Sequence, residues 1–114
     1  MAIQTERMHA GEFIVSKGNG SISREGITVL SGQVLVAGTV VGKITASGKY
    51  KDYDNAAADG SEVAAGILYD GVDAAAADAK GVLFARLGEV AGDSLTGNDA
   101  NGTADLLALN IIVR

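Results

Sequence analysis

The sequence predicts a small, mostly β domain with one short helix, an α+β fold class, preceded by an extended N-terminal arm. The first observation is that residues 32–50 group branched aliphatic side chains into short runs, which glycines interrupt at near-regular intervals. Branched side chains suit a pleated, half-buried surface, and glycine permits the bends between strands. The second observation is that residues 101–109 place good helix formers after a polar start. Together they favour several short strands and one helix.

The composition points to one domain with a thin apolar core. The chain has 114 residues, of which 47% are hydrophobic but only 4% aromatic, and it contains no cysteine. Because aliphatic side chains bury less area than rings and no disulfide can form, we expect oligomerisation to supplement the core. A net charge of −5 argues against binding to nucleic acid. No apolar window approaches the ~20 residues that span a bilayer, so no membrane partner is expected.

Residues 1–25 are predicted to form the arm, and residues 26–114 the β-rich domain. Apolar residues are sparse in the arm except at Phe13, Ile14 and Val15. A polar segment buries too little apolar surface to offset its ordering entropy, so we expect it to order on binding. The short apolar patch has two alternatives: it adds to the edge of another protein's sheet, or it pairs within its own domain.

The remaining elements follow from local patterns. A loop is expected at 51–61, with a turn at Asp59 and Gly60, and a loop or single turn at 73–79. The helix at 101–109 should end with Asn110 in the left-handed conformation. Besides the two strands of 32–50, strands are predicted at 27–30, 63–69, 81–87, 89–91 and 111–113.

No motif supports catalysis, a cofactor or a metal site. Residues 38–44 resemble a phosphate-binding loop, but the spacing is one residue short and Ile44 replaces the required hydroxyl. The acidic residues of 52–59 lack the glycine and glutamate of a calcium-binding loop. His9 is the only histidine and has no base or nucleophile near it in the sequence. We therefore expect a protein that is not an enzyme.

The order of several segments resembles the lambda-type head decoration proteins of tailed bacteriophages and prophages. The resemblance covers nearly the whole chain, and its parts are specific only in combination. These parts are Phe13-Ile14-Val15-Ser16, Ser23-Arg24-Glu25, AGTVVGKITASGKY at 37–50, DGSEVAAGILYDGVDAAAADAKG at 59–81, and the terminal residues 109–114.

The resemblance implies a β-tadpole-like domain that assembles as a homotrimer. Such trimers sit on the outside of the expanded phage head, over local threefold axes, and clamp neighbouring subunits of the major capsid protein. It also implies synthesis in the host cytoplasm and an arm that extends a capsid sheet. A deletion of residues 2–20 is then expected to leave a folded trimer that does not coat capsids. The residues expected to contact the capsid are Phe13, Ile14, Val15, Ser23, Arg24 and Glu25.

A carrier domain of the lipoyl or biotinyl type is the alternative. Such domains also contain glycine-punctuated β hairpins with an exposed lysine, and Lys43 or Lys49 would then be the attachment site. Neither lysine has the acidic or methionine flanks of the usual modification hairpin. This alternative is therefore the weaker one.

Overall fold

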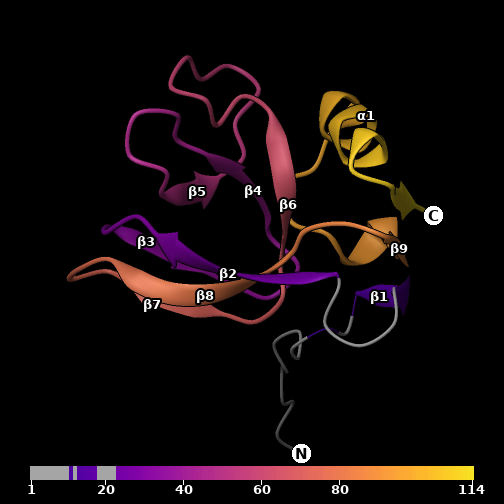
Figure 1. Cartoon of the computed structure of the whole chain (residues 1–114), viewed down its shortest axis with the longest axis horizontal. Coiled ribbons are helices and arrows are strands. Elements are labelled where there is room, and N and C mark those ends of the chain that lie inside the picture. The colour runs from indigo at the N-terminus through magenta and orange to yellow at the C-terminus, as the bar shows by residue number, and fades with distance from the viewer. Residues whose placement is uncertain (1–10, 12, 18–22) are drawn as a thin grey trace, which may run out of the picture.

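The computed structural model describes residues 11, 13–17 and 23–114 of the chain (Figure 1). In these residues the chain is mostly β, with a single short α-helix near the C-terminus. The elements are β1 (Ile14–Lys17), β2 (Arg24–Val29), β3 (Gln33–Leu35), β4 (Val40–Lys43), β5 (Tyr50–Asp52), β6 (Ala64–Leu68), β7 (Val72–Ala74), β8 (Ala79–Phe84), β9 (Gly88–Val90), a 3-10 turn η1 (Gly92–Ser94), α1 (Ala100–Ala108) and β10 (Ile111–Val113).

Five strands close into a small barrel in the order β2-β5-β4-β6-β8. β2 pairs antiparallel with β8 along its whole length, whereas it meets β5 only at Val29 and Tyr50. The predicted strand at 27–30 is confirmed, but it begins earlier, at Arg24. The predicted strand at 63–69 is β6, whose side chains are mostly buried because both of its faces are covered: Leu68 joins the core of the barrel, and Ile67 packs on the side of α1.

The two strands predicted in 32–50 exist as β3 and β4, but they belong to different sheets. β3 pairs with β7, while β4 lies between β5 and β6 in the barrel. Gly38 has φ 86° in the turn that separates them, a conformation that favours glycine. The loop predicted at 73–79 is wrong at both ends, because Asp73 and Ala74 belong to β7 and Ala79 begins β8. Pairing with β3 stabilises β7, and no pattern in the local sequence predicts this strand.

The third sheet has the order β1-β9-β10, with β1 antiparallel and β10 parallel to β9. The predicted strand at 81–87 ends earlier, at Phe84, and Leu87 with φ 58° separates it from β9. The apolar patch at 13–15 pairs within its own domain, through β9, which is the second of the two alternatives given for it. Residues 13–17 and 23–25 therefore lie against the domain, whereas His9 and the rest of 1–10 lie outside the described residues.

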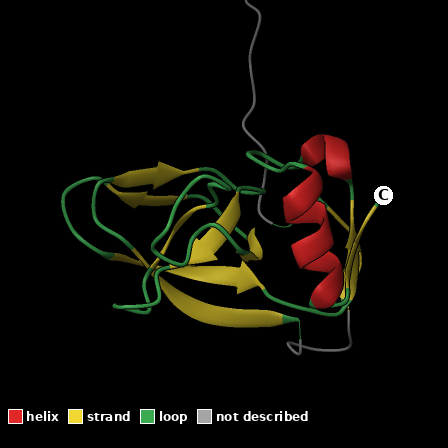
Figure 2. Cartoon of the chain, turned by 90° about the horizontal axis from the view of Figure 1, so that it is seen from above, coloured by secondary structure: helices red, strands yellow, loops and turns green. Residues whose placement is uncertain are grey.

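The helix closes one side of the molecule, next to the three-stranded sheet (Figure 2). Its N-cap is Asp99, whose carboxylate accepts a hydrogen bond from the Gly102 N–H at 2.7 Å. The chain leaves α1 through Asn110, which has φ 62° as predicted for the residue after the helix. On its inner side Leu106 is fully buried and joins Ile111 of β10 in the core.

The core consists of two clusters of buried side chains. One fills the barrel and is aliphatic, with Val29, Val41, Leu68 and Leu83 among its members. The other lies between the barrel, the helix and the three-stranded sheet, and it contains Phe13, Tyr53 and Phe84. Three of the five aromatic residues thus lie where the barrel, the helix and the three-stranded sheet meet.

Tyr53 connects the barrel to the helix and predicts a loss of stability at high pH. Its hydroxyl donates to Asp99 Oδ1 at 2.9 Å. Burial and then this bond raise the pKa of Tyr53 from 10.0 to about 12. Because the folded state holds the phenol neutral, its stabilising effect is complete below pH 10 and is lost as the pH rises toward 12. Denaturant titrations at pH 9 and pH 11.5 should therefore show a smaller pH-dependent loss for Tyr53→Phe than for the unchanged protein.

Candidate functional site

The six residues expected to contact a partner come from two segments that the fold brings to one end of the molecule. Backbone N–H groups on either side of β9 hold both of them. Ser23 accepts a hydrogen bond from the Ala85 N–H at 2.7 Å, and Phe13 accepts one from the Ala91 N–H at 2.8 Å. The site is therefore built from β1, the beginning of β2 and the residues that flank β9.

Phe13 is a core residue. Its side chain is 0% exposed, and its ring meets Phe84 edge-on, with the ring centroids 6.0 Å apart and the planes at 86°. Aromatic pairs prefer this arrangement. Phe13 is therefore not accessible to a partner in this conformation, and it fixes β1 to the domain.

The two residues after Phe13 differ in exposure. Ile14 is partly buried and packs against the core cluster, opposite Val90 in β9. The pairing register shifts between Ile14 and Ser16, so Val15 lies at an irregularity in the strand and is 59% exposed. Of the apolar patch, Val15 is the side chain that a partner can reach.

Ser23 has a structural role. It is fully buried, and its hydroxyl donates to the Leu87 carbonyl at 3.0 Å. This bond supports Leu87 in its positive-φ conformation, which a residue with a Cβ adopts only at some cost. Ser23 thus shapes the turn before β9.

Arg24 and Glu25 lie at the beginning of β2, where Arg24 is partly buried and Glu25 is exposed. The Arg24 guanidinium carbon lies 5.4 Å from the centroid of the Tyr69 ring, a cation–π contact. Glu25 forms an ion pair with Arg86 at 2.5 Å, with both side chains about half exposed. Such a pair on the surface contributes little to stability.

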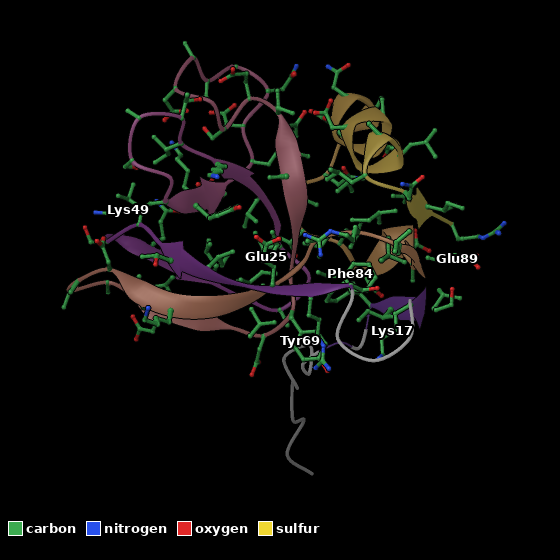
Figure 3. The ribbon with its side chains drawn as sticks, in the orientation of Figure 1. Lys17, Glu25, Lys49, Tyr69, Phe84 and Glu89 are labelled. Atoms are coloured by element: carbon green, nitrogen blue, oxygen red, sulfur yellow. The ribbon has the colours of Figure 1, made fainter. Side chains whose placement is uncertain are left out.

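Tyr69 and Gly11 belong to this end of the molecule, although the sequence alone did not single them out. The Gly11 N–H donates to the Tyr69 carbonyl at 2.9 Å, and the Gly11 carbonyl accepts from the Ile14 N–H at 3.0 Å. Figure 3 shows Tyr69 and Lys17 on the same, lower side of the ribbon. Nothing in the local sequence around Tyr69 signals this contact.

Glu89 connects the three strands of the small sheet. It accepts a hydrogen bond from the Ser16 hydroxyl at 3.1 Å and pairs with Arg114 beyond β10. The Arg114 bond, followed by the Ser16 bond, lowers the pKa of Glu89. Its register partner Ile112 is 42% exposed. This face therefore combines a charged link with an accessible apolar side chain.

The two lysines of the carrier alternative lie at the β4–β5 connection. The Lys49 ammonium is 2.6 Å from a carboxylate oxygen of Asp78, so it is held by an ion pair. Lys43 lines an open hollow of about 420 Å³ together with Glu25, Tyr50 and Lys80. A lysine that carries a lipoyl or biotinyl group has to be mobile, and the ion pair with Asp78 restrains Lys49.

In the part of the chain that the structure describes, no group of three carboxylate, histidine or cysteine side chains is placed to hold a metal ion. No helix of that part has the length and hydropathy needed to span a bilayer.

Comparison with known proteins gives one family. A family model described as Bacteriophage lambda head decoration protein D matches residues 3–111 of the 114 residues. No curated protein sequence matches significantly.

Proposed function

Because the chain belongs to the bacteriophage lambda head decoration protein family, we propose that it binds the major capsid protein as a homotrimer and stabilises the expanded head. The family gives it a structural role in decorating the phage capsid and a place on the virion. The proposed position is the outer surface of the shell, over local threefold axes, after synthesis in the host cytoplasm. The match over residues 3–111 is the observation that carries this proposal.

The edge of β1 is the proposed contact with the capsid, together with the residues that precede it. Among the described strands β1 has one neighbour, β9, so its other edge is open. An edge strand presents backbone N–H and C=O groups that another chain can pair with. Val15 adds an exposed apolar side chain. Phe13 contributes indirectly, because it holds this edge in place from the core.

Self-association is proposed because the surface retains large apolar side chains that a small domain cannot bury alone. A trimer would cover part of this surface and would carry three capsid-contacting segments. Linked contacts make the second and third binding events intramolecular, so weak single contacts add up to tight attachment. The exposed large apolar residues of the described part are Val15, Val34, Val63, Val82, Leu87, Leu107 and Ile112.

The proposed mechanism is mass action on the assembled shell. A protein that binds the expanded head but not the unexpanded one stabilises the expanded form by its binding free energy. At a free concentration 100-fold above Kd, this amounts to about 2.7 kcal/mol per site. No chemical step is required.

Removal of residues 2–10 tests this function, because the deletion keeps Phe13, β1 and the rest of the described fold. A deletion through residue 20 would also remove Phe13 and β1, and would therefore test folding rather than binding. We expect the 2–10 deletion to weaken capsid binding about 100-fold or more, as the loss of multivalent attachment implies. Cosedimentation with expanded and unexpanded heads of the encoding phage or prophage measures this. Equal coating of both kinds of head by the intact protein would contradict the proposal.

A matched pair of valine variants locates the contact more finely. Val15 in β1 and Val63 in the turn before β6 are 59% and 53% exposed. If β1 contacts the capsid, Val15→Ser should weaken binding about tenfold, as the loss of one buried apolar side chain implies. Val63→Ser should leave binding unchanged. Equal effects of the two variants would mean that β1 is not the contact.

A further inference from the structure

Arg24 differs from the other arginines that the structure describes. Arg86 forms an ion pair with Glu25 at 2.5 Å, and Arg114 pairs with Glu89. In the described part of the chain, Arg24 has no carboxylate partner and donates no hydrogen bond from its Nε, although this nitrogen is shielded from solvent. A shielded donor without an acceptor is costly, so proteins rarely retain one without a use.

The Arg24 guanidinium is nevertheless held in place. It lies over the Tyr69 ring, with the guanidinium carbon 5.4 Å from the ring centroid. The backbone of Tyr69 is fixed on both sides: its N–H donates to the Val82 carbonyl at 2.8 Å, and its carbonyl accepts from Gly11 at 2.9 Å. A cation that is positioned before binding loses little conformational entropy on binding.

The position of Arg24 connects it with the N-terminal segment. Gly11, which is bonded to Tyr69, is the first residue that the structure describes, and β1 follows it closely. Figure 3 shows Tyr69 on the same side of the ribbon as Lys17 of β1. Arg24 and Gly11 therefore share Tyr69 as a neighbour, which places Arg24 close to the beginning of the described chain, just before β1.

We propose that Arg24, held on Tyr69, is a docking anchor that donates hydrogen bonds to a carboxylate of the capsid subunit. The inference rests on the proposed function and adds the chemistry of the partner to it. The planar guanidinium matches a carboxylate in a bidentate arrangement, and arginine and tyrosine are over-represented among residues that dominate interface energies. A second copy of this chain is the other conceivable donor of a carboxylate, because the chain carries a net charge of −5. The capsid is favoured because Arg24 adjoins the segment that is proposed to bind it.

The experiment compares Arg24→Gln with Arg86→Gln in the full chain. Both variants remove one arginine charge from the same end of the molecule, but the Arg86 charge is already paired within the chain. We expect Arg24→Gln to weaken binding to expanded heads by about tenfold to 100-fold, the range for a hydrogen-bonded charge pair. Arg86→Gln should weaken it less than about threefold. Arg24→Lys should restore only part of the affinity, because lysine lacks the planar fork.

Two further measurements make the outcome decisive. Thermal unfolding should give the same midpoint for Arg24→Lys as for the unchanged protein, so that any loss of binding is not a loss of folding. Light scattering should show the same oligomeric state for Arg24→Gln as for the unchanged protein.

Equal binding by Arg24→Gln and Arg86→Gln would overturn the anchor while leaving the proposed function intact. A smaller oligomer for Arg24→Gln would place its partner on a second copy and also overturn the proposal. If the unchanged protein binds no heads at all, the proposed function fails, and the anchor fails with it.

Discussion

Replacing Phe13 with alanine should lower the free energy of unfolding by about 3 to 5 kcal/mol, the range for truncating a fully buried phenylalanine. The side chain is 0% exposed and packs edge-on against Phe84 in the cluster between barrel, helix and small sheet. Its loss would leave a cavity and would also loosen β1. Urea denaturation at one fixed protein concentration measures the effect, because the stability of an oligomer depends on concentration.

Val15→Ala provides the control in the same strand. Val15 is largely exposed, so its truncation should change the free energy of unfolding by less than about 0.5 kcal/mol. A loss below about 1 kcal/mol for Phe13→Ala would contradict the burial of this ring. It would mean that residues 13–17 detach from the domain at little cost, as an arm does.

Gly42→Ala should destabilise the barrel by about 3 kcal/mol, at the upper end of the usual range for overpacking. A Cβ at this position would lie 2.6 Å from both the Cα and the carbonyl oxygen of Ser61. These are backbone atoms, so the contact cannot be relieved by a side-chain rotation, and either β4 or the turn before β6 has to move. Urea denaturation monitored by circular dichroism measures this loss in the free energy of unfolding.

Gly26→Ala is the matched substitution in β2, another strand of the same barrel. A Cβ there meets nothing within 4 Å, and β2 is extended at this position. Because alanine restricts the unfolded chain more than glycine does, this variant should be neutral or up to about 1 kcal/mol more stable. Equal losses in the free energy of unfolding for Gly42→Ala and Gly26→Ala would show that the close approach of Gly42 to Ser61 does not restrict the side chain at this position.

Local patterns predicted much of the secondary structure. The branched run at 63–69, the helix with Asn110 after it and the terminal strand at 111–113 are all present as β6, α1 and β10. β7 was missed because Val72, Asp73 and Ala74 have no strand pattern of their own. Their strand conformation depends on pairing with β3, which lies far away in the sequence.

The candidate site could be predicted only in part. Ser23, Arg24 and Glu25 were singled out together, yet the structure gives them separate roles: Ser23 is buried, Arg24 lies on Tyr69, and Glu25 pairs with Arg86. Capsid contact by these residues stays a prediction. Tyr69 was missed because its ring acquires a role only when β6 brings it next to Arg24 and Gly11.

The sequence by itself determined that this chain forms a mostly β domain with one helix, and its segment order was sufficient to indicate the family. These properties depend on backbone preferences and on the spacing of apolar residues, both of which are local. Only the tertiary structure decided that Phe13 is a core residue, that β3 and β4 separate into different sheets, and that Arg24 has no carboxylate partner among the described residues. Burial, strand pairing and ion pairing depend on which distant segments meet, and no single segment encodes that.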